Sequence, residues 1–182
     1  MRKRMMAAAC AAALFLSFAS AGNVAAEPLA SSDGTYEVDL PDGYVNLRGS
    51  IDPQGDEQDF LILAGHGGPT PVYLLSVSEM KGAPQFPSLT EYAEILTEGV
   101  MASDLFTDPS PKIPLESFRT GEEIPCMKTC FTAGYGSLQI DYYIYALEGE
   151  SCYYQFCAWT TAGNAAAGPE LDAIVSSFTL HG

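Results

Sequence analysis

The chain has 182 residues, with 23 acidic against 8 basic side chains and a formal net charge of −15 at pH 7. A surface this negative repels phosphate backbones and anionic lipid headgroups, which argues against a role on nucleic acid or at a membrane surface. The composition fits a soluble protein that works outside the cell, and it is compatible with association with cations.

The first 26 residues predict a secretory signal peptide. Arg2, Lys3 and Arg4 precede an alanine-rich apolar run, and small residues at 19–21 and 24–26 offer two cleavage sites. The run is shorter than the ~20 residues of a membrane-spanning helix. Cys10 lies ahead of most of it, the wrong end for a lipid-modified cysteine. We therefore expect an exported protein, periplasmic or extracellular, with no stable membrane anchor.

Residues 27–182 suit one domain, which opens with a strand and a hairpin. Tyr36, Val38 and Leu40 alternate with polar residues, as in a half-buried strand, and 41–44 reads as a turn. Residues 60–64 are apolar throughout, which predicts a central strand. A turn at 65–69 then leads into a strand over 72–78.

The polar stretch 46–58 is expected to be a solvated loop. A calcium site is the alternative for its carboxylates, although their spacing does not match a helix–loop–helix calcium loop. The acidic residues in and beside this stretch are Asp52, Asp56, Glu57 and Asp59.

Two helices are predicted. Ser88 and Glu91 form a capping box at the start of the first, and Pro169 opens the second, where a missing amide hydrogen does no harm. A short strand is expected at 115–120. The apolar faces are Leu89, Tyr92, Ile95, Leu96 and Val100 in the first helix, and Leu171, Ile174, Val175 and Phe178 in the second.

Residues 124–160 predict a three-stranded meander with turns at 134–136 and 148–150, where Gly149 would supply a positive φ. Pairing Leu147 with Ser151 places Tyr142 opposite Phe156, so that apolar residues face one another. The first apolar face holds Leu138, Ile140, Tyr142, Ile144 and Ala146, joined by Met127, Phe131 and Ala133.

Aromatic residues gather on the second face of this meander in the predicted register. One interpretation is a binding surface, because tyrosine and tryptophan offer large contact areas with a polar handle. The favoured interpretation is core, because helices must pack somewhere on the sheet. The residues concerned are Tyr143, Tyr145, Tyr153 and Trp159.

Four cysteines remain after the leader: Cys126, Cys130, Cys152 and Cys157. An even count in an exported protein favours at least one disulfide. The first and third strands of a straight meander lie ~10 Å apart, whereas a disulfide joins Cα atoms at ~4.4–6.8 Å. A bridge therefore requires a bulge or a first strand that starts late. Zinc is the alternative, but the spacing is unusual and no histidine is near.

Two features raise the alternative of a hydrolase. The Gly-His-Gly-Gly sequence around His66 resembles the oxyanion loop of esterases, but the chain has no Gly-x-Ser-x-Gly elbow, and the only other histidine is His181. Asp141 could be a buried acid, although a surface charge is the default for such a residue.

The order strand, hairpin, helix, meander, helix predicts a single α+β domain: an antiparallel sheet with two helices packed on it. Residues 40–44 (Leu-Pro-x-Gly-Tyr), 88–92 (Ser-Leu-x-Glu-Tyr) and 174–178 (Ile-x-x-Ser-Phe) resemble the PsbP-like fold, which exported bacterial lipoproteins and DcrB-type proteins share. The four cysteines and the lack of a lipidation cysteine depart from that pattern.

The resemblance implies a non-catalytic accessory or binding protein with no cofactor, whose partner is an unidentified envelope protein or small ligand. A hydrolase using His66 or Asp141 and a calcium-dependent binding module are the alternatives.

Overall fold

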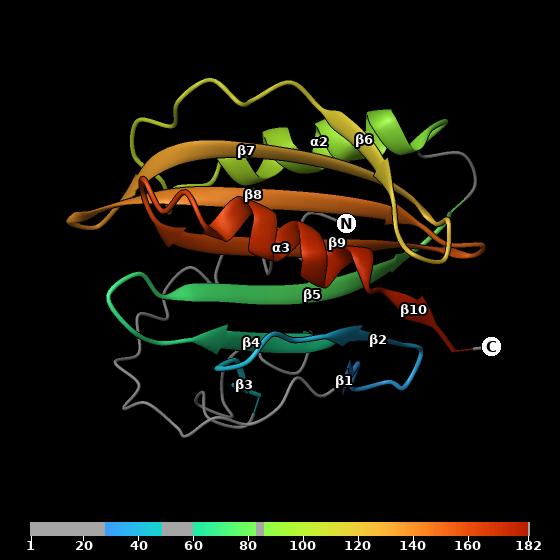
Figure 1. The fold of residues 1–182 in the computed structure, drawn as a ribbon. Helices are drawn as coiled ribbons and strands as arrows, with labels where there is room; N and C mark the ends of the chain where they lie inside the picture. Colours follow the sequence, from blue (N-terminus) through green and yellow to red (C-terminus); the bar gives the residue numbers. More distant parts are fainter. Residues whose placement is uncertain (1–27, 49–59, 83–85, 182) are drawn as a thin grey trace.

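The computed structural model describes residues 28–48, 60–82 and 86–181 (Figure 1). The predicted signal peptide and the proposed calcium carboxylates therefore lie outside the described residues. The larger of two antiparallel sheets has the order β3-β4-β5-β9-β8-β7-β6. Its strands are β3 (Val45–Asn46), β4 (Ile62–His66), β5 (Val72–Met80), β6 (Glu116–Arg119), β7 (Pro125–Tyr135), β8 (Leu138–Glu148) and β9 (Cys152–Thr161).

A smaller sheet has the order β1-β2-β10. Its strands are β1 (Pro28–Ala30), β2 (Tyr36–Asp39) and β10 (Thr179–Leu180). The strand predicted around Tyr36 is confirmed as β2, and Gly43 adopts a φ of +92° in the predicted turn after it. The sequence did not predict that β2 would pair outside the main sheet.

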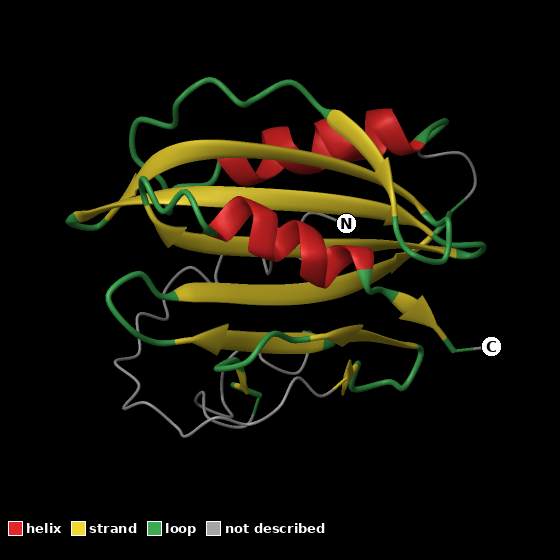
Figure 2. Cartoon of the chain, viewed as in Figure 1, coloured by secondary structure: helices red, strands yellow, loops and turns green. Residues whose placement is uncertain are grey.

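The helices α2 (Leu89–Met101) and α3 (Ala167–Ser176) lie on opposite faces of the larger sheet, which Figure 2 shows. One core fills the space under α2. A second core lies on the other face, under α3 and the smaller sheet. The predicted single α+β domain with two packed helices is confirmed, and both faces of its main sheet are buried.

The core under α2 contains most of the predicted helix stripe. Ser88 caps α2, since its hydroxyl accepts a hydrogen bond from the Glu91 amide at 3.2 Å. Ile95 is an error of the prediction: its exposed fraction is 36%. Thr97 is buried instead, and its hydroxyl donates to the Ala93 carbonyl at 2.7 Å.

The last helix starts two residues before the predicted position. The helix α3 begins at Ala167, whose amide donates a hydrogen bond to the Asn164 carbonyl. Pro169 is therefore its third residue. Proline is tolerated there since amides of the first helical turn lack partners within the helix. Phe178 is buried as expected, but it lies beyond the end of the helix.

The meander is confirmed as β7, β8 and β9, but its predicted register between β8 and β9 is wrong by three residues. Tyr142 lies opposite Trp159 rather than Phe156, and Tyr145 takes the place opposite Phe156. Because side chains alternate between faces, an odd shift moves every β9 residue to the other face relative to β8.

The role of Gly149 also differs from the prediction, since its φ is not positive. Glycine is needed for space: an added Cβ would lie 2.7 Å from the Tyr154 ring. The hairpin of β4 and β5 is confirmed, yet β4 is second from the sheet edge rather than central. Its continuous apolar sequence arises because Leu63 packs under α2 while Ile62 and Ala64 pack on the other side.

The predicted disulfide is wrong, because all four described cysteines are free. Cys126 and Cys130 belong to β7, whereas Cys152 and Cys157 belong to β9, and β8 lies between these strands. Cys126 packs in the core under α3 and Cys157 in the core under α2. The straight meander leaves no bulge that would bring the sulfur atoms together.

Candidate functional site

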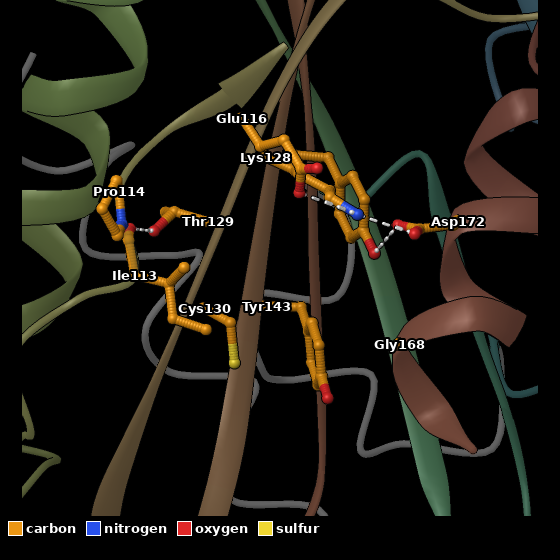
Figure 3. Close-up of a pocket in the computed structure, with 10 residues that line it drawn as sticks. Ile113, Pro114, Glu116, Lys128, Thr129, Cys130, Tyr143, Gly168 and Asp172 are labelled. Carbon is orange, nitrogen blue, oxygen red and sulfur yellow. Dashed lines mark hydrogen bonds and ion pairs between the residues drawn. The ribbon is translucent and has the colours of Figure 1, made fainter. Parts of the chain in front are cut away.

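A pocket of about 130 Å³ opens beside α3, on the sheet face opposite α2 (Figure 3). It lies between β7, β8, the first turns of α3 and the segment that leads into β6. The lining residues are Ile113, Pro114, Glu116, Lys128, Thr129, Cys130, Tyr143, Tyr145, Gly168 and Asp172.

Strand alternation builds the floor of this pocket. Lys128 lies opposite Tyr145 and Cys130 opposite Tyr143 in the register of β7 and β8, so all four side chains share one face. Gly168 forms part of the wall, and a Cβ there would lie 3.6 Å from the Tyr143 ring. The absence of a side chain at Gly168 therefore keeps that ring accessible.

Three charged groups meet at one end of the pocket. The Lys128 Nζ lies 2.7 Å from Asp172 Oδ2 and 3.3 Å from Glu116 Oε2, and the Tyr145 hydroxyl donates to Asp172 Oδ1 at 3.0 Å. Burial by itself would lower the pKa of Lys128, but the two carboxylates outweigh it and raise that pKa. Lys128 is therefore a fixed cation at neutral pH and not a general base.

The thiol and the phenol at the other end stay protonated. Burial, reinforced by the charge of Asp141, raises the pKa of Cys130 to about 11. Burial also raises the pKa of Tyr143 to about 12, with added repulsion from Cys130 and Asp141. Because the thiolate is the nucleophilic form of cysteine, a pKa of about 11 leaves only a very small nucleophilic fraction of Cys130 at neutral pH. These groups can recognise a ligand by hydrogen bonding and packing.

The four aromatic residues that the predicted register places on the second face of the meander do not share one face. Tyr143 and Tyr145 line the pocket, whereas Tyr153 and Trp159 lie in the core under α2. The Trp159 ring is fully buried and stacks on Tyr73 and Tyr142, with ring centroids 5.4 Å and 6.1 Å away. The three-residue register shift separates the two pairs.

His66 pairs with a carboxylate of α3. Its Nε2 lies 3.3 Å from Glu170 Oε1, which also accepts a hydrogen bond from the Tyr44 hydroxyl at 2.6 Å. Its Nδ1 lies 2.9 Å from the Gly67 carbonyl. Within the described ranges, these contacts of His66 are with a carboxylate and a backbone carbonyl, and none of them is with a serine or cysteine.

Asp141 holds two segments together. Its carboxylate accepts hydrogen bonds from the Thr132 hydroxyl at 2.7 Å and from the Gly163 amide at 2.8 Å. The residue therefore anchors the loop after β9 to the strands of the hairpin. Both bonds are explained by structure, without a reacting group.

Sequence reasoning missed the charged end of the pocket. Lys128 and Cys130 could have been found from the alternation of β7, which places them on the same face as Tyr143. Asp172 comes from α3, 44 positions after Lys128, so no local pattern joins them. Among the described residues, no three histidine, cysteine or carboxylate side chains are placed to hold a metal ion.

No protein-family model and no curated protein sequence matches the chain. Solved structures do match it. The solution structure of cyanobacterial PsbP (CyanoP) from Synechocystis sp. PCC 6803 is similar to 92% of this chain, over 99% of its own length, with a TM-score of 0.54 at 13% identity. The chain has a PsbP-like fold. This confirms the fold that the three short sequence motifs predicted; the likeness to DcrB-type proteins stays a prediction.

Two other structures share the PsbP-like fold of this chain. LpqN of Mycobacterium tuberculosis, described as involved in cell envelope biogenesis, matches with a TM-score of 0.55 at 10% identity, over 86% of this chain and 90% of LpqN. A Bacteroides thetaiotaomicron VPI-5482 crystal structure matches with a TM-score of 0.56 at 9% identity, over 87% of this chain. The chain spans about half the length of that protein, 50%. Identities this low concern the fold and not the function.

Proposed function

We propose that the protein is an exported, non-catalytic accessory protein of the cell envelope, which binds a partner protein through the pocket beside α3. The observation that carries this proposal is the pocket itself. Polar groups from β7, β8 and α3 converge there on a small opening, and the raised pKa values of Lys128, Cys130 and Tyr143 keep these three groups protonated at neutral pH.

The size of the pocket favours a partner over a whole small ligand. Its volume of about 130 Å³ is below the ~300–1,000 Å³ of sites that enclose drug-sized molecules. One protruding side chain fits such a space. A side chain anchored in a pocket is also the usual energetic centre of a protein interface.

The envelope location rests on the sequence and on the comparisons together. The first 26 residues have the pattern of a signal peptide. LpqN, which shares the fold, is described as involved in cell envelope biogenesis. No helix in the described part of the chain has the length and apolarity to cross a bilayer.

The experiment compares two substitutions at Gly168. Gly168→Ala adds a Cβ at an ordinary contact distance of 3.6 Å from Tyr143, so the pocket stays open. Gly168→Leu places a branched side chain over the Tyr143 ring and fills the pocket. Each protein, without its first 26 residues, is immobilised and exposed to an envelope extract of its own cells.

We expect the native chain and Gly168→Ala to retain the same protein, and Gly168→Leu to lose it. Circular dichroism and thermal unfolding check that Gly168→Leu is folded. Retention of that protein by all three, or by none, would contradict the proposal.

A further inference from the structure

The charge around the pocket is unbalanced. Asp172 and Glu116 flank Lys128 at one end, and Asp141 lies on the same strand face at the other end, opposite Thr132. Two carboxylates thus flank the one ammonium group of the pocket, and a third carboxylate lies beyond its other end. The whole chain adds to this field with its formal net charge of −15. A cationic group is therefore attracted into the pocket, and an anion is repelled.

The carboxylates retain capacity to accept hydrogen bonds. A carboxylate offers about four lone-pair sites on its two oxygens. Asp172 receives one hydrogen bond from Lys128 and one from Tyr145. Glu116 pairs with Lys128 through Oε2, and 69% of its side chain is exposed. A donor that enters the pocket can reach both groups.

The remaining walls suit an apolar stem. Ile113 and Pro114 lie on one side of the pocket and Tyr143 on the other, next to Gly168 (Figure 3). The half-buried Tyr143 ring lines the pocket and can contact a cation there through its π face. A chain of methylene groups that ends in a cation matches this combination of walls and charge.

Building on the proposed function, we infer that the pocket receives an arginine side chain of the partner protein. The planar guanidinium has five donors in a fixed fork, pairs with a carboxylate through two parallel hydrogen bonds, and stacks on aromatic rings. It is also more weakly hydrated than an ammonium, so its entry into a partly apolar pocket is less costly. Glu116, Asp172 and Tyr143 are the residues that recognise it.

The test is an NMR titration of the mature protein with N-acetyl-arginine methylamide at low salt. We expect saturable shifts of the amide signals of Cys130, Tyr143 and Gly168. The matched citrulline compound has the same shape without the charge and should leave these signals unchanged. Equal binding of the two compounds, or no saturable shift with the arginine compound, would overturn the inference.

Two variants, each of which removes one negative charge, distinguish binding to the pocket carboxylates from attraction by the overall negative charge of the protein. Glu116→Gln removes a carboxylate of the pocket and should weaken binding by about two- to fivefold, the range for an exposed ion pair. Glu123→Gln removes the same charge at a side chain that is 81% exposed and pairs with Arg119, and it should have no such effect. Equal weakening by both variants would overturn the role of Glu116. A lysine compound that binds as tightly as the arginine compound would overturn the choice of arginine.

The results distinguish this inference from the proposed function. If Gly168→Leu loses the captured partner but the arginine compound does not bind, the proposed function stands and the arginine is wrong. If the compound binds but Gly168→Leu still captures the partner, both the proposed function and the assignment of the arginine to a partner are overturned.

Discussion

Gly65 lies where β4 and β5 approach too closely to leave room for a side chain. An added Cβ would be 2.8 Å from the Val72 carbonyl oxygen and 3.0 Å from the Tyr73 ring. The carbonyl belongs to the paired strand and cannot move without breaking the ladder. We therefore expect Gly65→Ala to lower the free energy of unfolding by ~1–3 kcal/mol, as measured by urea denaturation.

Gly168→Ala is the control for that substitution, since its new Cβ meets no atom closer than 3.6 Å. Alanine also restricts the unfolded chain and favours the helix. It should leave stability unchanged or raise it by ~0.4–1 kcal/mol. A Gly65→Ala protein as stable as the native chain would show that β4 and β5 are not packed as described.

The cysteines behave as separate residues and not as a bridge. We expect a reducing agent to leave the melting temperature unchanged, and iodoacetamide to label all four described cysteines after denaturation without reductant. In the native protein Cys157 should label slowly, because it is fully buried and burial raises its pKa to about 12. Mass spectrometry of the labelled peptides measures the labelling of the denatured protein and the labelling rate of Cys157 in the native protein. Two cysteines that stay unlabelled in the denatured protein would reveal a disulfide.

At the scale of elements, the longer strands and both described helices followed from the sequence in their type and order, but the short strands β1, β3 and β10 and the register of β8 with β9 did not. Pairing rules work when one face of a strand is polar. In β9, Tyr153, Tyr154, Phe156 and Trp159 supply aromatic residues to both faces. Either register therefore places apolar residues opposite apolar residues. The choice depends on the two helical layers, which no local pattern encodes.

The residues of the candidate site could be predicted only in part from the sequence. Tyr143 and Tyr145 were identified from alternation on β8, and the same alternation on β7 marks Lys128 and Cys130. Asp172 could not be placed, because the position of α3 on the sheet depends on its packing against β2 and β9. The sequence pattern thus predicts which strand residues form the floor of the pocket, but it does not predict that α3 forms one of its walls.

The separation of the four aromatic residues can be tested by truncation. Trp159→Ala removes a fully buried ring from the core under α2, and should lower the free energy of unfolding by ~3–5 kcal/mol. Tyr143→Ala removes a ring that lines the open pocket, and we expect a clearly smaller loss. Chemical denaturation followed by circular dichroism measures both. Equal losses would contradict the placement of the two residues in different environments.

The molecule as a whole should lose stability at alkaline pH. Burial raises the pKa of the Cys157 thiol to about 12 and of the Cys130 thiol to about 11, from a reference value of 9.0. The unfolded chain releases these protons from about pH 9 while the folded chain keeps them, so the unfolded state is favoured as pH rises. Their contribution to stability is thus complete below pH 9 and is lost as pH rises through the folded pKa values.

We expect the free energy of unfolding to be flat between pH 7 and pH 8.5 and to fall above pH 9, by up to about 1.4 kcal/mol per pH unit for each fully buried group. Urea denaturation across this range measures it. Cys157→Ala should have a shallower dependence, since one such group is removed. The same slope in both proteins would contradict the buried, protonated thiol.

The most direct test of the central claim, that the pocket beside α3 is where the protein binds, is hydrogen–deuterium exchange of the protein alone and with its captured partner. We predict slower exchange with the partner in peptides that cover 113–116, 127–131, 142–146 and 166–173. Slower exchange confined to α2 and the opposite face of the sheet, with the pocket peptides unchanged, would contradict the account.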